Sequence, residues 1–335
     1  MLKTLFKITI FICVVFVLSI FVVIPKIIQH RLISAVEESC ASCRLSIGHT
    51  RLSLFPTTLS LEEIQFSGGN PDATAVKADI GRFSTGFSLR HLWSREFELS
   101  DTQVERPNVD VIEGDLSSPS SPHNNSPGPK FVIEGIKISS GTFSYTRVYG
   151  KRRAELHTKN LNGSIGQMGS IPSFHDMISH GEITGRLENS GEFRLTVATP
   201  LFAKDLSVDV SLKLLNQNLA DLTPFFEVDS GLALSGLLIR GDSLIQIRDN
   251  SLHGWVMVQY RDLKIKLEKT KDRSALSAFF SSLISSAKTV SSNVNHDHKK
   301  QIESVDLQKK EHDNTVIKFI LHGLRDAALM VTSKS

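Results

Sequence analysis

The sequence predicts a mainly β protein that is tied to a membrane by a single helix near its N-terminus. Residues 8–24 form one nearly unbroken apolar run without a charge. After residue 43, much of the chain alternates polar and apolar residues, which is the period of a half-buried strand. The candidate strands follow one another closely and lack the helices of βαβ units, so we expect a meandering antiparallel sheet.

The apolar run, ITIFICVVFVLSIFVVI, is preceded by Lys3 and Lys7 and predicts a retained single-pass anchor. A signal peptide has an apolar core of about 7–15 residues and a small-residue cleavage site. This run is longer, and residues 22–31, VVIPKIIQHR, contain no such site. With its flanks, a helix here could cross a hydrocarbon core of about 30 Å. A removed signal is the alternative, whereas Thr9 and Ser19 alone make no polar face for a buried core helix.

The helical pattern continues beyond the anchor, through apolar residues near the i, i+4 spacing of one helix face. These residues are Ile27, Ile28, Leu32, Ile33 and Val36. The positive-inside rule leans slightly towards a cytoplasmic N-terminus. We therefore expect the inner (cytoplasmic) membrane, with the C-terminal β region in the periplasm.

Cys40 and Cys43 form a Cys-Ala-Ser-Cys motif where this helical pattern ends. A lone CxxC can be a redox motif, half of a zinc site or a small disulfide. No second CxxC or histidine pair follows at zinc-site spacing, and no βαβ pattern surrounds the motif. A structural disulfide is favoured in an oxidising compartment, and two free thiols are the alternative.

The clearest strand covers residues 206–214, where apolar residues alternate with Ser207, Asp209, Ser211 and Lys213. The apolar side of this strand consists of Leu206, Val208, Val210, Leu212 and Leu214. Residues 193–197 and 263–267 alternate in the same way. About a dozen strands are expected in all, and the Glu62-Glu63 pair interrupts one of them as a β-bulge would.

Several segments divide the predicted sheet. Residues 115–130 are rich in Ser, Pro and Asn and predict an exposed loop. Residues 274–290 predict an amphipathic helix that packs on the sheet, lies on a membrane or binds a partner. A polar connector to residue 313 and a last strand near residues 315–321 would follow. The expected parts are therefore residues 1–38, 39–114, 115–130, 131–270, 271–313 and 314–335.

No motif in the chain points to catalysis or to a cofactor. The net charge of +3 comes from interspersed charges of both signs, so no nucleic-acid partner is expected. The nucleophile elbow, the HExxH motif, the P-loop and the dinucleotide fingerprint are missing. His296, His298 and His312 lie in a polar tract that is more typical of a solvated segment than of a metal site. We expect no enzymatic activity, no cofactor and no metal.

The order of several short segments resembles the AsmA-like family of bacterial envelope proteins. After the anchor come IGHTRLSLFP at residues 47–56 and LSLEEIQF at 59–66, which resemble an early strand ending in Pro and the next strand. FSLRHLW at 87–93 is similar to a short Leu-rich helix, and VERPNV at 104–109 to the strand after it. ISSGTFSY at 138–145 and the segments 219–236 and 252–255 are similar to later strands. The resemblance covers most of residues 1–270.

The resemblance implies a twisted, open β-groove with an apolar lining. Large members of the family are associated with phospholipid transport between membranes, and smaller ones with outer-membrane assembly. A dozen strands about 4.8 Å apart reach only about 60 Å, so a bridge across the periplasm would need partners or oligomers.

Two functions follow as expectations. The apolar side of residues 206–214 would line a groove for membrane lipid, although the same residues could fill an ordinary core. Alternatively, the protein would be a scaffold for envelope assembly, with an exposed sheet edge that pairs with a strand of another envelope protein.

Overall fold

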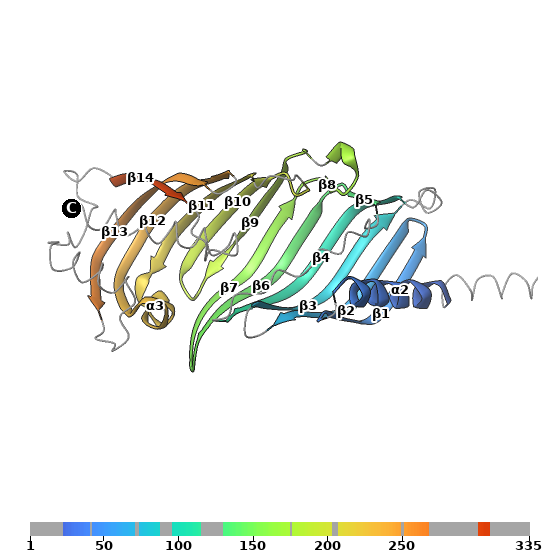
Figure 1. The fold of residues 1–335 in the computed structure, drawn as a ribbon, viewed down its shortest axis with the longest axis horizontal. Helices are drawn as coiled ribbons and strands as arrows, with labels where there is room; N and C mark the ends of the chain where they lie inside the picture. The colour runs from blue at the N-terminus through green and yellow to red at the C-terminus, as the bar shows by residue number, and fades with distance from the viewer. Residues whose placement is uncertain are drawn as a thin grey trace, which may run out of the picture.

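The computed structural model forms one long, open, curved β-sheet with short helices against it (Figure 1). Its described residues are 23–40, 42–70, 74–87, 96–114, 130–174, 176–202, 207–248, 251–267 and 301–308.

The N-terminal half begins with a helix and continues with long strands. In order, the elements are α2 (Ile24–Ser39), β1 (Arg44–Leu54), β2 (Thr57–Asn70), β3 (Thr74–Phe87), β4 (Glu96–Glu113), β5 (Lys130–Ile133), β6 (Ile136–Tyr149) and β7 (Arg152–Ile165). The turn between β1 and β2 consists of Phe55 and Pro56, which are joined by a cis peptide bond.

The C-terminal half contains further strands and a short helical insertion. Its elements are β8 (Met168–Gly169), η3 (Pro172–Phe174), β9 (Ser179–Leu187), β10 (Gly191–Thr199), β11 (Ser207–Asn218), η4 (Leu219–Leu222), α3 (Thr223–Ser230), β12 (Leu232–Arg248), β13 (Ser251–Leu267) and β14 (Gln301–Gln308). The mainly β character and the alternating strands are confirmed.

The sheet has 14 strands, and its main path runs β1-β2-β3-β4-β6-β7-β9-β10-β11-β12-β13-β14. Among the described residues it does not close on itself, because β1 and β14 each pair on one side only. The expectation of a wholly antiparallel sheet is wrong at one junction, where β4 pairs in parallel with β5 and β6. A parallel pair needs a long connection, and here the chain between residues 114 and 130 supplies it. The parallel pairing of β4 with β6 thereby joins two antiparallel meanders.

Residues with positive φ interrupt many strands. Glu63 has φ 55°, and neither β1 nor β3 pairs with it, but the register does not shift there, so the predicted bulge at Glu62-Glu63 is an irregularity without an extra residue. Ser140, Asn160, Asn216 and Asp262 also have φ of 54–55°. At Ser140, Asn160 and Asp262 the register also shifts, as it does in β-bulges, which bend a strand and increase its twist.

The helices differ in part from expectation. The helical continuation of residues 27–36 is confirmed as α2, but its apolar residues do not form one buried face, because Ile27 and Leu32 are exposed. Residues 219–230, expected within strands, form η4 and α3 instead. The helix is favoured by Pro224 near its start and by Gly231, whose left-handed φ of 68° ends it.

The polar connector expected before residue 313 is also corrected, because β14 pairs with β13 there. The apolar run before Val23, the helix 274–290, the last strand at 315–321 and residues 88–93 of the Leu-rich helix lie outside the described residues. So does the loop 115–130 up to residue 129. Within the described residues, no helix is both long enough and apolar enough to cross a membrane.

Candidate functional site

One face of the sheet carries an apolar row that continues across several strands. Paired residues of neighbouring strands point to the same side of a sheet, so the strand register defines continuous rows. One such row runs Leu45–Phe66–Ala78–Val109–Phe143–Thr158–Leu187 from β1 to β9 and carries no charge. The side of the sheet on which it lies is called the apolar face below.

The adjacent row lies on the opposite side, here called the polar face. It runs Arg44–Ser67–Lys77–Asp110–Ser144–His157. Across the parallel junction, hydroxyl groups on this face donate to side-chain oxygens, Ser144 to Asp110 and Thr142 to Asn108 (2.7 Å). The alternation along the strands therefore makes one sheet with two chemically distinct sides.

Both helices pack on the apolar face. Ile33 of α2 joins a cluster formed by Ile47, Leu61 and Ile64, and Gln29 Nε2 donates to the carbonyl oxygen of Ile47 at 2.5 Å. Further along the sheet, α3 covers β6 and β7 through a second cluster, which contains aromatic residues.

In the cluster under α3, the side chain of Phe225 is 8% exposed and packs against Tyr145 and Ala154. Thr223 Oγ1 fixes the start of α3, because it donates to the carbonyl oxygen of Leu234 at 2.7 Å and accepts from its N–H at 2.8 Å. α3 therefore occupies a defined place on the apolar face.

The predicted lipid-facing residues lie in β11 on the apolar face, except Leu206, which is outside the described residues. Val208 and Val210 are 7% and 4% exposed and belong to a third cluster with Ile245, Ile247 and Leu252. Leu212 and Leu214 are half-buried. The five predicted positions thus do not form one equally accessible stripe: the two described valines are core residues.

A half-buried group beside this cluster was not singled out from sequence. It consists of Ile183, Phe193, Leu195 and Val197, on β9 and β10. Leu195 pairs with Ile183 on one side and Leu212 on the other, so these residues extend the apolar face towards β7. The alternation of residues 193–197 predicted a strand, but only the register shows which strands it joins.

Cys40 and Cys43 lie between α2 and β1, and their sulfur atoms are joined in the structure as a disulfide. The backbone N–H of Cys40 also donates to Val36 O, which closes the last turn of the helix. The pair thus lies at the change of direction from helix to sheet.

The polar face holds a shallow hollow of about 350 Å³ over β7 to β12. His180, Glu182 and Asp209 line it, and basic side chains pair with its two carboxylates: Arg194 with Glu182 at 3.6 Å and Arg248 with Asp209 at 2.7 Å. Among the described residues, no group of His, Cys, Asp or Glu is arranged to hold a metal ion. The paired charges are typical of a solvated sheet surface.

Comparison with known protein families and with curated proteins finds no match to this chain.

Proposed function

We propose that the protein is an envelope-biogenesis protein, anchored in the inner membrane, whose apolar β-face binds phospholipid and helps to transfer it. The observation that carries the proposal is the charge-free row that crosses the sheet from Leu45 to Leu187. The residues of this row are half-buried, so the row keeps part of its apolar surface accessible to a ligand. The resemblance to AsmA-like proteins supports the same function.

The dimensions of the row suit an acyl chain. From β1 to β9 it extends about 29 Å, at about 4.8 Å per strand along the path of the sheet. One leaflet of a bilayer has a hydrocarbon thickness of about 15 Å, half of the core. A single acyl chain could therefore lie across several strands, with its headgroup outside the sheet margin.

The partial burial of the face between the α3 cluster and the third cluster also supports the proposal. Ile183, Phe193, Leu195 and Val197 each keep part of their surface exposed. Covering such side chains with an apolar ligand favours binding by a free energy of about 25 cal/mol per Å² of apolar area removed from water. The lipid contacts are therefore assigned to these residues and to Leu212 and Leu214, rather than to Val208 and Val210.

Photo-crosslinking at two adjacent residues of β10 tests the proposal. Leu195 lies on the apolar face, and its neighbour Arg194 points to the polar face with its side chain 58% exposed. A photoreactive amino acid at position 195 of the full membrane-bound chain should trap phospholipid, which mass spectrometry would identify. The same amino acid at position 194 should trap several-fold less.

Equal lipid capture at both positions, or none at either, would overturn the proposal. Capture of a protein in place of lipid would favour the second candidate function, a non-enzymatic scaffold for outer-membrane assembly. That alternative rests on the outer edge of β1, an 11-residue strand that pairs with β2 alone among the strands that the structure describes. Such an edge can accept a strand of another protein.

A further inference from the structure

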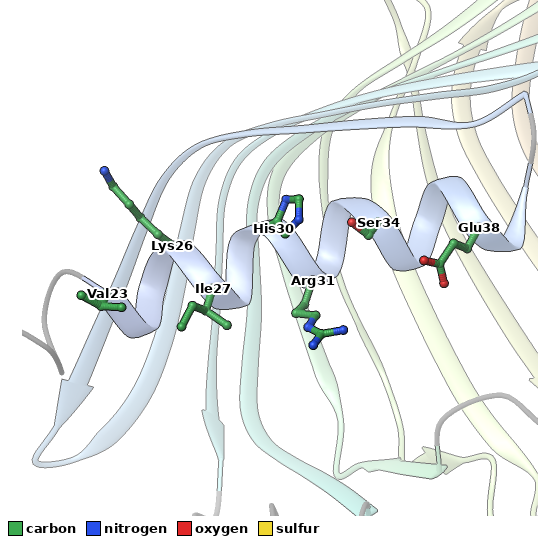
Figure 2. Close-up of a pocket in the computed structure, with 7 residues that line it drawn as sticks. All are labelled: Val23, Lys26, Ile27, His30, Arg31, Ser34 and Glu38. Carbon is green, nitrogen blue, oxygen red and sulfur yellow. The ribbon is translucent and has the colours of Figure 1, made fainter.

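The outer side of α2 carries a chemical pattern that packing on the sheet does not explain. The inner side contacts the sheet through Ile33 and Gln29. The outer side borders a hollow of about 830 Å³, and Figure 2 shows the side chains along it. These side chains are Val23, Lys26, Ile27, His30, Arg31, Ser34 and Glu38.

This outer side combines exposed aliphatic and basic groups. Val23 is 49% exposed and Ile27 is 53% exposed. Lys26 and Arg31 are also exposed. Ile27 and Arg31 project to the same side of the helix (Figure 2). A helix with this mixture is suited to the boundary between headgroups and acyl chains.

The order of charges along α2 opposes its own dipole. A helix is stabilised by acidic residues at its start and by basic residues at its end. The first turn of α2 holds no acidic residue, and its last turn holds no basic residue. Lys26 lies near the start instead, and the carboxylates of Glu37 and Glu38 lie at the end. The basic residues are therefore not placed to stabilise the helix itself.

The basic residues also have no carboxylate partner in the part of the chain that the structure describes. Neither Lys26 nor Arg31 forms an ion pair or a side-chain hydrogen bond there. A strong external anion would suit these positions. The nature of that anion follows from the sequence next to the helix, because the apolar run of residues 8–24 ends where α2 begins.

We infer that the outer side of α2 lies on a bilayer surface and binds anionic phospholipid headgroups through Lys26 and Arg31, with Val23 and Ile27 dipping between the lipids. Basic side chains near an anionic bilayer favour binding by about fivefold each. This inference rests on the membrane anchor of the proposed function. It adds an orientation: α2 would hold the β1 end of the sheet close to the headgroups.

The test places a photoreactive amino acid at position 27 of the full chain. The protein is reconstituted into vesicles of phosphatidylcholine alone, or of phosphatidylcholine with a minor share of phosphatidylglycerol. We expect several-fold more lipid capture in the anionic vesicles. The double variant Lys26→Gln with Arg31→Gln should remove most of that several-fold gain, because the attraction of the two charges to the anionic surface is lost.

A matched control removes two basic residues from the sheet, Lys213→Gln with Lys264→Gln, both exposed on strands. It makes the same change in net charge and should leave capture at position 27 unchanged. Capture that does not depend on phosphatidylglycerol, or that falls equally in both double variants, would overturn the inference.

The result of this test can be distinguished from the result of the test of the lipid-binding proposal. Lipid capture at position 195 without charge-dependent capture at position 27 refutes the contact of α2 alone. If an alkaline wash releases the chain from the vesicles, the anchor is refuted, and the inference about α2 falls with it.

Discussion

At the scale of single residues, the apolar face contains two kinds of side chain. Ile247 and Leu252 are 0% exposed and stabilise the sheet. Leu195 and Leu212 are half-buried on the same face and can still gain from a ligand. Sequence alternation alone cannot separate the two kinds, because it places all of them on one side without showing what covers them.

Replacing Ile247 by Ala should lower the free energy of unfolding by about 2–5 kcal/mol, because the truncation leaves a cavity in a fully buried site. Denaturant unfolding of the purified full chain measures this. Leu195→Ala is the matched control: it should destabilise the protein less but weaken lipid binding more. An equal loss of stability in both variants would show that Leu195 is a core residue and that the face is closed there.

At the scale of elements, α3 shows what a local pattern can and cannot predict. Its Pro224 and Gly231 mark a helix start and end that were visible in the sequence. The expectation of strands at residues 219–236 came from the resemblance to AsmA-like proteins, and the strand preference of aromatic residues such as Phe225 and Phe226 does not oppose it. A helix forms here in place of a strand because it buries the ring of Phe225 against Tyr145. The two ring centroids are 6.1 Å apart.

Phe225→Ala should therefore destabilise the protein by about 3–5 kcal/mol, since the ring is nearly buried under α3. Phe55→Ala removes the same side chain from a turn where it is 94% exposed, and it should change stability by less than about 0.5 kcal/mol. Thermal and denaturant unfolding of both variants provide the comparison. Similar stabilities would mean that α3 does not hold its place on the sheet.

Two other elements depended on contacts that are distant in sequence. The parallel pairing of β4 with β6 is decided by where the chain returns after residue 114, and no local period encodes that. β14 pairs with β13 across a separation of more than thirty residues, and its sequence, QIESVDLQ, is too polar to indicate a strand. The irregularity at Glu63, by contrast, was predictable because the alternation of β2 changes phase there.

At the scale of the whole molecule, one open sheet holds a charge-free row on one side and a charged row on the other. The parallel junction matters here, because it joins two meanders while keeping their apolar sides on the same face. The sequence predicted the β class, about a dozen strands and an apolar side. It could not predict that this side would be continuous across the junction, since continuity depends on register.

The central claim is that this continuous face carries phospholipid, and lipid analysis of the protein itself tests it most directly. The full chain is extracted from membranes in mild detergent, purified and examined by mass spectrometry under native and denaturing conditions. Leu195→Asp, which places a charge on the apolar face, is the comparison. We expect phospholipid bound to the parent protein in a roughly fixed ratio, and strongly reduced binding in a folded Leu195→Asp variant. A lipid-free parent protein, or equal lipid in both, would contradict it.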